Sequence, residues 1–147
     1  TTGLEASLQY DLGNGFGVSA NYTYTDANND GERDVANPGS GLVMGASENM
    51  LNASAFYEND MFSVRAMYNY RTKWYKGLHS SGTELWNDDY GQLDFSTTYN
   101  VTENISVVLE AINLTDEKVV EFNTSEDRVL SIYQNGRRFV LGANFRF

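Results

Sequence analysis

Residues 138–147 read RFVLGANFRF, and this stretch decides the fold. Its odd-numbered positions are all apolar, whereas the positions between them are polar or small, with Val140 as the exception. Because successive side chains of a β-strand point to opposite faces, the pattern predicts a strand with one apolar face. The apolar positions are Phe139, Leu141, Ala143, Phe145 and Phe147.

The same alternation recurs in six further segments of the chain. Each segment has about ten residues, which is the length of a tilted strand that crosses a membrane. Frequent tyrosine, phenylalanine and asparagine also favour strands and turns over helices. We therefore predict an all-β, antiparallel fold whose seven strands cover residues 4–12, 16–25, 51–58, 62–71, 92–99, 105–111 and 138–147.

Aromatic residues lie near the ends of most of the apolar faces, and charged residues lie on the opposite faces. A soluble β-sandwich would instead bury small and large aliphatic side chains. Two aromatic girdles with a polar interior are typical of a transmembrane barrel, which we therefore prefer to a soluble β-rich module. The charged residues expected to face the lumen, paired in salt bridges across neighbouring strands, are Arg65, Arg71, Asp94, Glu110 and Arg146.

The 147 residues carry a formal net charge of −10 and include no cysteine and one histidine. An acidic chain lacks the basic patch that a nucleic-acid partner requires. The absence of cysteine excludes disulfides and thiolate metal sites. No catalytic constellation of side chains is present, so we predict no enzyme activity.

Short and long connections alternate between the predicted strands. Outer-membrane barrels have short periplasmic turns and long external loops, so the C-terminus is expected in the periplasm. Seven is an odd number, and the chain therefore reads as the last part of a larger barrel. The short turns are at 13–15, 59–61 and 100–104, and the long polar loops are at 27–49, 75–89 and 115–136.

One segment leaves the strand count open. Residues 128–133 alternate weakly, and the following Gln-Asn-Gly-Arg could form a tight hairpin. An eighth strand would complete a small barrel, but it would place all the long loops on the periplasmic side. We therefore expect seven strands, with 115–136 as a loop that extends the last hairpin.

Four stretches together resemble the C-terminal part of a TonB-dependent outer-membrane receptor. They are GLEASLQYDLGNGFGVSANYTYTDA, FSVRAMYNYRTKW, YGQLDFSTTYNVTENISVVLEAINLTDE and GRRFVLGANFRF. Asn113, Leu114 and Asp116 are similar to the family's Asn-Leu-Phe-Asp stretch, although Thr115 replaces the aromatic residue. The resemblance covers essentially residues 1–147.

The resemblance implies a 22-stranded barrel in the bacterial outer membrane, embedded in lipid and filled by a plug that lies outside this chain. Such a receptor imports a scarce ligand, an oligosaccharide or an iron-bearing siderophore, with energy delivered through the TonB system. The barrel-assembly machinery would read the closing strand, with Phe147, Phe145 and Phe139 as its signal. The alternative function is a passive porin, or a small complete barrel with an adhesive or structural role.

Two loops contain candidate binding residues. Asp26, Asn28, Asp30 and Asp34 have the spacing of a calcium loop, but the usual glutamate at its last position is missing, and an ordinary acidic loop is the alternative. In the loop at 75–89, aromatic and polar side chains could bind a sugar ring or a siderophore, or could simply form the outer girdle. The ligand candidates are Trp86, His79, Asp88 and Tyr90.

Overall fold

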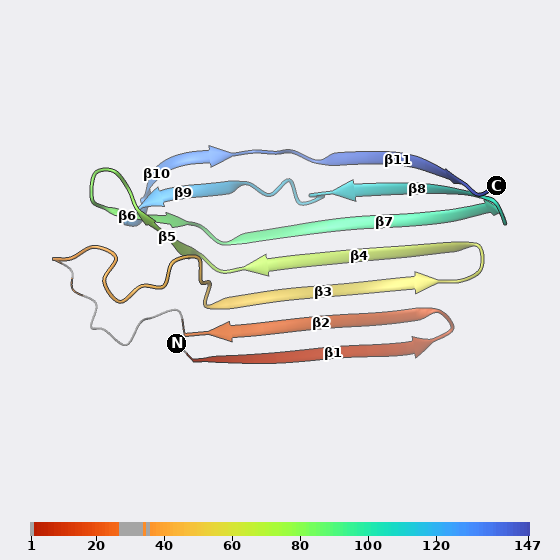
Figure 1. Ribbon diagram of the computed structural model, residues 1–147, viewed down its shortest axis with the longest axis horizontal. Coiled ribbons are helices and arrows are strands. Elements are labelled where there is room, and N and C mark those ends of the chain that lie inside the picture. Colours follow the sequence, from red (N-terminus) through yellow and green to blue (C-terminus); the bar gives the residue numbers. More distant parts are fainter. Residues whose placement is uncertain (1, 27–33, 35) are drawn as a thin grey trace.

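The computed structural model describes residues 2–26, 34 and 36–147. Seven strands form one antiparallel sheet, here called the main sheet, in the order β1-β2-β3-β4-β7-β8-β11. Figure 1 shows these long strands side by side, with the chain's C-terminus at the end that carries the short turns. Their bounds are β1 Gly3–Gly13, β2 Phe16–Thr25, β3 Asn49–Glu58, β4 Phe62–Arg71, β7 Tyr90–Thr102, β8 Ile105–Ile112 and β11 Arg138–Phe145.

The main sheet confirms the seven strands predicted from the alternation. It is an open sheet, with β1 at one edge and β11 at the other. The all-β antiparallel prediction is also confirmed, and no helix in the described part of the chain is long and apolar enough to cross a membrane.

The register keeps the predicted apolar positions on one face of the main sheet. Leu8 pairs with Ala20, Ala20 with Ala53, Ala53 with Tyr68, and Tyr68 with Leu93. Directly paired residues share a face, so this row crosses five strands without changing sides. Large apolar side chains on this face are exposed, among them Leu8, Tyr10 and Leu141. An exposed apolar surface of this extent needs a nonpolar environment.

Phe56, which breaks the alternation of its strand, lies on the polar face for a packing reason. It pairs with Gly17 on one side and with Arg65 on the other. The Phe56 ring lies where a side chain of residue 17 would stand, and the Arg65 guanidinium lies 5.2 Å from the ring centroid. A glycine and a cation therefore accommodate one aromatic ring among polar neighbours.

The long connections predicted as loops at 75–89 and 115–136 contain four strands, so that part of the prediction was wrong. The strands are β5 Trp74–Leu78, β6 Glu84–Asn87, β9 Val119–Asn123 and β10 Ser125–Tyr133. They form a second sheet, here called the loop sheet, in the order β10-β9-β6-β5. Figure 1 shows it beyond the end of the main sheet that is opposite the C-terminus.

Each strand of the loop sheet continues a strand of the main sheet. β4 leads into β5, β6 into β7, β8 into β9 and β10 into β11. Residues 134–137 therefore join two consecutive strands that run the same way in Figure 1, and they do not form a tight hairpin. The expectation that 115–136 extends the last hairpin is confirmed, because β9 pairs with β10.

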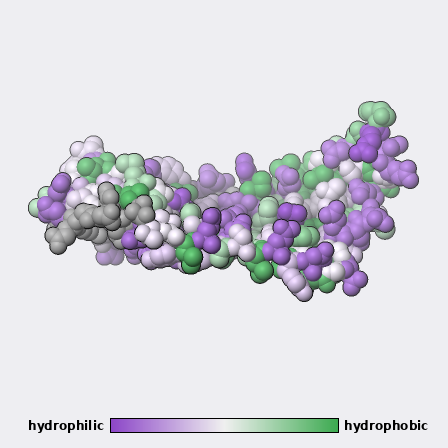
Figure 2. Space-filling model, turned by 60° about the horizontal axis from the view of Figure 1, so that its bottom comes forward, coloured by the Kyte–Doolittle hydropathy of each residue, from purple (hydrophilic) through white to green (hydrophobic). Residues whose placement is uncertain are grey.

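Most of the buried side chains lie in the loop sheet and in the segment that covers it. The main sheet is a single layer in this chain, so it has no internal core of its own. Figure 2 shows hydrophilic side chains gathered at the turn end of the molecule. The buried residues in and around the loop sheet include Ser47, Tyr75, Glu84, Asn87, Glu121 and Phe122.

The Gly17–Phe56 pair gives a test of the register. A valine at position 17 would overlap the Phe56 ring, and overpacking typically costs about 1–3 kcal/mol. We expect Gly17→Val to lower the unfolding temperature of the assembled barrel, as measured by heat-dependent gel mobility. Gly17→Val combined with Phe56→Ala is the matched control, because removal of the ring leaves room for the added side chain. Equal effects of the single and the double variant would contradict the packing that the register implies.

Candidate functional site

Three aromatic rings form the core of the loop sheet. Tyr75 pairs with Trp86, and Trp86 pairs with Phe122, so the three side chains share a face. The ring centroids of Tyr75 and Trp86 lie 5.5 Å apart at an interplanar angle of 57°. Tyr75 and Phe122 are buried and Trp86 is half-buried. Trp86 is therefore a packed residue of strand β6, although the sequence pattern predicted a loop at 75–89.

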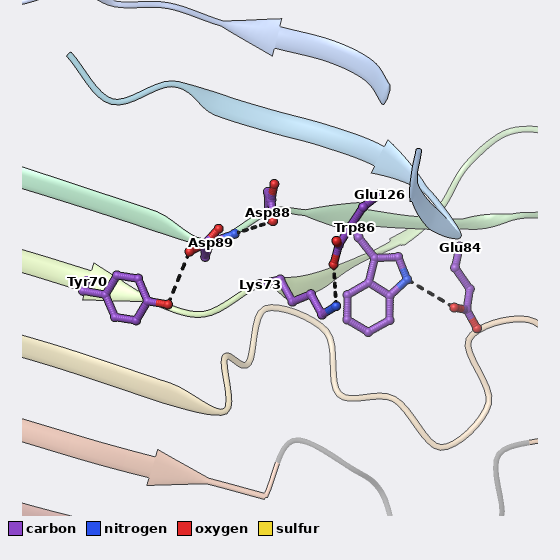
Figure 3. Close-up of polar contacts among 7 residues, drawn as sticks. All are labelled: Tyr70, Lys73, Glu84, Trp86, Asp88, Asp89 and Glu126. Carbon is purple, nitrogen blue, oxygen red and sulfur yellow. Dashed lines mark hydrogen bonds and ion pairs between the residues drawn. The ribbon is translucent and has the colours of Figure 1, made fainter. Parts of the chain in front are cut away.

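Glu84 ties this aromatic core to the segment that precedes β3. The Trp86 indole Nε1 donates to Glu84 Oε2 at 3.2 Å, as Figure 3 shows. The Gly39 backbone N–H donates to Glu84 Oε1 at 3.1 Å. Burial, together with the nearby Glu84 charge, raises the pKa of the Tyr75 phenol. The aromatic face is thus covered by the chain itself and fixed by a buried carboxylate.

The opposite face of the loop sheet is polar. Lys76 forms an ion pair with Glu121, and Ser131 Oγ donates to Glu121 Oε2 at 2.8 Å. The hydrogen bond from Lys76 lowers the pKa of Glu121. Asn87 pairs with Glu121 in the register and is buried, and its Oδ1 has no hydrogen-bond partner among the described residues.

An exposed ion pair spans the loop sheet. Lys73 Nζ lies 2.7 Å from Glu126 Oε1, and Figure 3 shows this contact. Between Ser125 and Val129 the β10 strand leaves its register with β9, so Glu126 belongs to a bulge. Surface ion pairs contribute little to stability, and this one mainly orients the bulge toward β5.

Carboxylates gather at the junction of the two sheets, a feature that sequence reasoning did not foresee. The Tyr70 hydroxyl donates to Asp89 Oδ2 at 3.3 Å, and the Asp89 N–H donates to Asp88 Oδ1 at 3.0 Å (Figure 3). Burial, then the charges of Asp89 and Glu126, raises the pKa of Asp88. Burial, then the charges of Asp89 and Asp88, raises the pKa of Glu117. Burial and the neighbouring charges thus disfavour the ionised forms of Asp88 and Glu117.

Asn113 fastens the same junction. Its backbone has φ of 59°, a left-handed conformation that asparagine tolerates better than most residues. It is 4% exposed, and its side chain accepts from the Glu117 N–H at 2.8 Å and donates to the carbonyls of Glu117 and Gly136. Its own N–H donates to Asp94 Oδ1 at 2.8 Å. The Asn-Leu-x-Asp pattern was the sequence signal that pointed to this residue.

A chain of side-chain hydrogen bonds runs along β7 from the junction. The Tyr90 hydroxyl donates to Gln92 Oε1 at 2.5 Å, and Gln92 Nε2 donates to both carboxylate oxygens of Asp94 at 2.7 and 2.9 Å. Asp94 in turn accepts a hydrogen bond from the Asn113 N–H. One predicted ligand residue, Tyr90, is thereby linked to one predicted lumen residue, Asp94.

The four predicted ligand residues do not form one cluster. Trp86 lies in the aromatic core, and Asp88 and Tyr90 lie at the junction. His79 lies in the hairpin between β5 and β6, where its Nδ1 is 2.9 Å from Ser81 Oγ. Their roles in ligand binding stay predictions, and the four residues lie in three places: the aromatic core, the junction and the hairpin between β5 and β6.

The charged residues predicted for the lumen share the polar face but do not pair with one another. Arg65 packs on Phe56, and Arg71 lies 3.8 Å from the Trp74 ring centroid. Arg71 also donates to Ser47 Oγ at 2.8 Å and to the Gly45 carbonyl at 2.9 Å. The expected salt bridges are thus replaced by aromatic and neutral partners, because the register does not bring opposite charges together. Arg65 pairs with Ser96, and Ser96 pairs with Glu110, so Ser96 separates these two charged residues. Arg146 comes directly after the end of β11.

The remaining predicted sites stay predictions. Of the residues predicted to bind calcium, Asn28 and Asp30 lie outside the described residues, and the structure describes only Asp26 and Asp34. Phe139 and Phe145 lie exposed on the apolar face, and Phe147 is fully exposed.

A hollow of about 570 Å³ lies at the other end of the sheet, among the short turns. It contains none of the predicted ligand residues. Its lining is polar and includes Asp60, Asn100, Glu103, Asn104, Asn144 and Arg146.

A family model described as TonB dependent receptor-like β-barrel matches residues 1–114. A comparison with curated proteins gives no match. Among solved structures, the ferric-catecholate import receptor Fiu from K12 E. coli is 28% identical with a TM-score of 0.75, over 99% of this chain and 20% of that receptor.

Two further receptors show the same fold at lower identity. The siderophore receptor PiuA from Acinetobacter baumannii is 22% identical with a TM-score of 0.70, over 97% of this chain and 21% of its own. A mutant of the ferric enterobactin receptor PfeA from Pseudomonas aeruginosa is 20% identical with a TM-score of 0.65, over 96% and 21% respectively. The chain therefore spans about a fifth of the length of these receptors.

Substitutions of Asn113 separate its side-chain bonds from its backbone conformation. Asn113→Gly keeps the left-handed backbone but loses the bonds, and leaving buried partners unpaired costs about 1–3 kcal/mol. Asn113→Ala adds backbone strain of about 1 kcal/mol. We expect proteolytic cleavage of the loop sheet to accelerate in the order wild type, glycine, alanine. Equal cleavage of all three would show that Asn113 does not fasten the junction.

The junction carboxyls predict a dependence on pH. When folding raises the pKa of a carboxyl group, the folded state favours the protonated form of that group. The resulting stabilisation is fully present below the pKa of the unfolded state and is lost as the pH rises through the pKa of the folded state. The ordinary values are 3.8 for Asp88 and 4.5 for Glu117. We therefore expect the resistance of the loop sheet to proteolysis to fall as the pH rises above these ordinary values toward neutrality.

Two substitutions check the sign of this effect. Asp88→Asn should slow cleavage at neutral pH and reduce the gain on acidification. Glu121→Gln should accelerate cleavage at neutral pH. The lowered pKa of Glu121 means that its ionised form stabilises the fold at pH values above its unfolded pKa of 4.5. A pH dependence unchanged by Asp88→Asn would exclude Asp88 as its source.

Proposed function

The chain belongs to the family of TonB dependent receptor-like β-barrels, and we propose that it forms the C-terminal part of a receptor that imports a ferric siderophore. The family comprises receptors and transporters of the bacterial outer membrane and not enzymes. In this proposal the energy for import arrives through TonB, and the plug and the other barrel strands belong to the rest of the receptor.

The observation that carries the proposal is the match to Fiu along nearly the whole chain, with both sheets included in the aligned length. The neighbours named above are receptors for siderophores, catecholates or enterobactin, which favours a ferric siderophore over an oligosaccharide. The sugar interpretation rested on the aromatic residues of the loop at 75–89, and two of them, Tyr75 and Trp86, are packed on each other.

The arrangement of the two sheets supports one orientation in the membrane. The exposed apolar face of the main sheet would contact lipid, and the polar face with Arg65 and Asp94 would line the lumen. The short turns, the polar hollow and the C-terminus would lie in the periplasm. The loop sheet would then stand outside the cell, where a ligand first meets the receptor.

The junction is the part of this chain best placed to respond to a ligand. It lies between the external sheet and the lumen, and the hydrogen bonds from Tyr90 through Gln92 to Asp94 run from it down β7. A ligand seated against Asp88 or Tyr90 would thereby act on a residue of the polar face. In the same proposal, the closing strand with Phe139, Phe145 and Phe147 is read by the barrel-assembly machinery.

Uptake of iron-55 tests the function. The full receptor chain is expressed in cells that lack other siderophore receptors, and the probes are the ferric complexes of one catecholate and one hydroxamate siderophore. We expect saturable uptake of at least one complex, and loss of that uptake when TonB is deleted. A strain without the receptor is the control.

Other outcomes would favour the alternatives. Uptake that is undiminished without TonB would indicate a passive porin. Absence of uptake for both complexes, together with TonB-dependent uptake of an oligosaccharide, would indicate that the ligand is an oligosaccharide. A native chain near 16.5 kDa would indicate a small complete barrel and would exclude import through a plugged receptor.

A further inference from the structure

The outer edge of the loop sheet carries exposed apolar side chains. β10 is the edge strand, and near its end Val129, Leu130, Ile132 and Tyr133 are 50%, 46%, 57% and 52% exposed. Val129 pairs with Phe122 and Tyr133 pairs with Val119, three residues away on β9, so the apolar side chains lie on both faces of β10.

Burial falls steeply across the loop sheet toward this edge. Phe122 on β9 is 3% exposed, and its neighbour Val129 on β10 is half exposed. Val129 and Ile132 share one face of β10, whereas Tyr133 lies on the other face with Ser131. Edge strands in water usually carry charges or prolines, and residues 129–133 contain neither. The second half of β10 therefore lacks the residues that usually protect an exposed edge.

The opposite edge of the loop sheet shows how this protein covers an edge. Ser47 forms a β-bridge with Trp74, and the Gly45 N–H donates to the Tyr75 carbonyl at 2.8 Å. The segment before β3 thereby occupies the outer side of β5. Among the described residues no segment pairs with the outer side of β10.

The position of β10 indicates what would cover it. β10 continues through residues 134–137 into β11, the edge strand of the main sheet, and Figure 1 shows the two in one line. If the proposed function is right, β11 pairs with another strand of the same barrel. That strand, continued outside the membrane, would run along β10 as well.

We propose that the outer side of β10 binds an extended segment of the same receptor, namely the external continuation of the strand that closes against β11. The segment adds an antiparallel strand to the loop sheet, and its backbone pairs with the free N–H and C=O groups of β10. Apolar side chains on the added strand cover Val129 and Ile132 on one face and Tyr133 on the other. The barrel seam thus extends beyond the membrane into the loop sheet.

Cysteine labelling of the full receptor in intact cells tests this proposal. Ile132→Cys reports on the covered edge, and Asp127→Cys, in the exposed bulge of the same strand, is the matched control. With a membrane-impermeant maleimide, we expect labelling at position 132 to be slower by about tenfold or more, as for sites reached only by local opening. Equal rates would overturn the proposal.

Hydrogen exchange on the unsubstituted receptor gives a second measurement that needs no variant. The amides of residues 129–133 alternate between the side that faces β9 and the outer side. Protection of both sets is expected, and protection of the β9 side alone would overturn the proposal.

Two further measurements distinguish a covered edge from a contact between two receptors and from failed assembly of the barrel. A bifunctional maleimide that joins two receptors through position 132 would assign the edge to a second copy and would also overturn the proposal. Heat-dependent gel mobility shows independently whether the chain forms a barrel. A folded barrel that imports iron but labels freely at position 132 would refute only the covered edge.

Discussion

The ladder of backbone hydrogen bonds between neighbouring strands holds the main sheet together, because this sheet has no second layer to pack against. In such a sheet a shift by one residue would exchange the apolar and polar faces of a whole strand. The row from Leu8 to Leu93 shows that no such exchange occurs across five strands. One face of the sheet is therefore predominantly apolar and the other carries most of the polar groups.

The loop sheet depends on the same ladder but has a core. Four strands of the main sheet cross the junction and pair again in the corresponding order, and Tyr75, Trp86 and Phe122 pack between them and the preceding segment. Two connections that are far apart in sequence thereby become one body. The aromatic core therefore joins the two connections to each other.

The junction between the sheets combines two opposing interactions. Asn113 stabilises it through hydrogen bonds of its side-chain amide and its backbone N–H, while burial and neighbouring charges disfavour the ionised forms of Asp88 and Glu117. The hydrogen bonds of Asn113 therefore lie beside carboxyl groups whose charged forms are disfavoured.

The sequence by itself determined the main sheet, because a period of two in side-chain polarity is a local property that each strand displays without its neighbours. It also determined the family, through stretches that lie on these strands. It did not determine the loop sheet, since β5, β6 and β9 are too short to show a period and their pairing joins residues distant in the chain. Only the tertiary structure decided that Trp86 is a core residue and that Arg71 binds Trp74 and Ser47, because register alone sets which side chains meet.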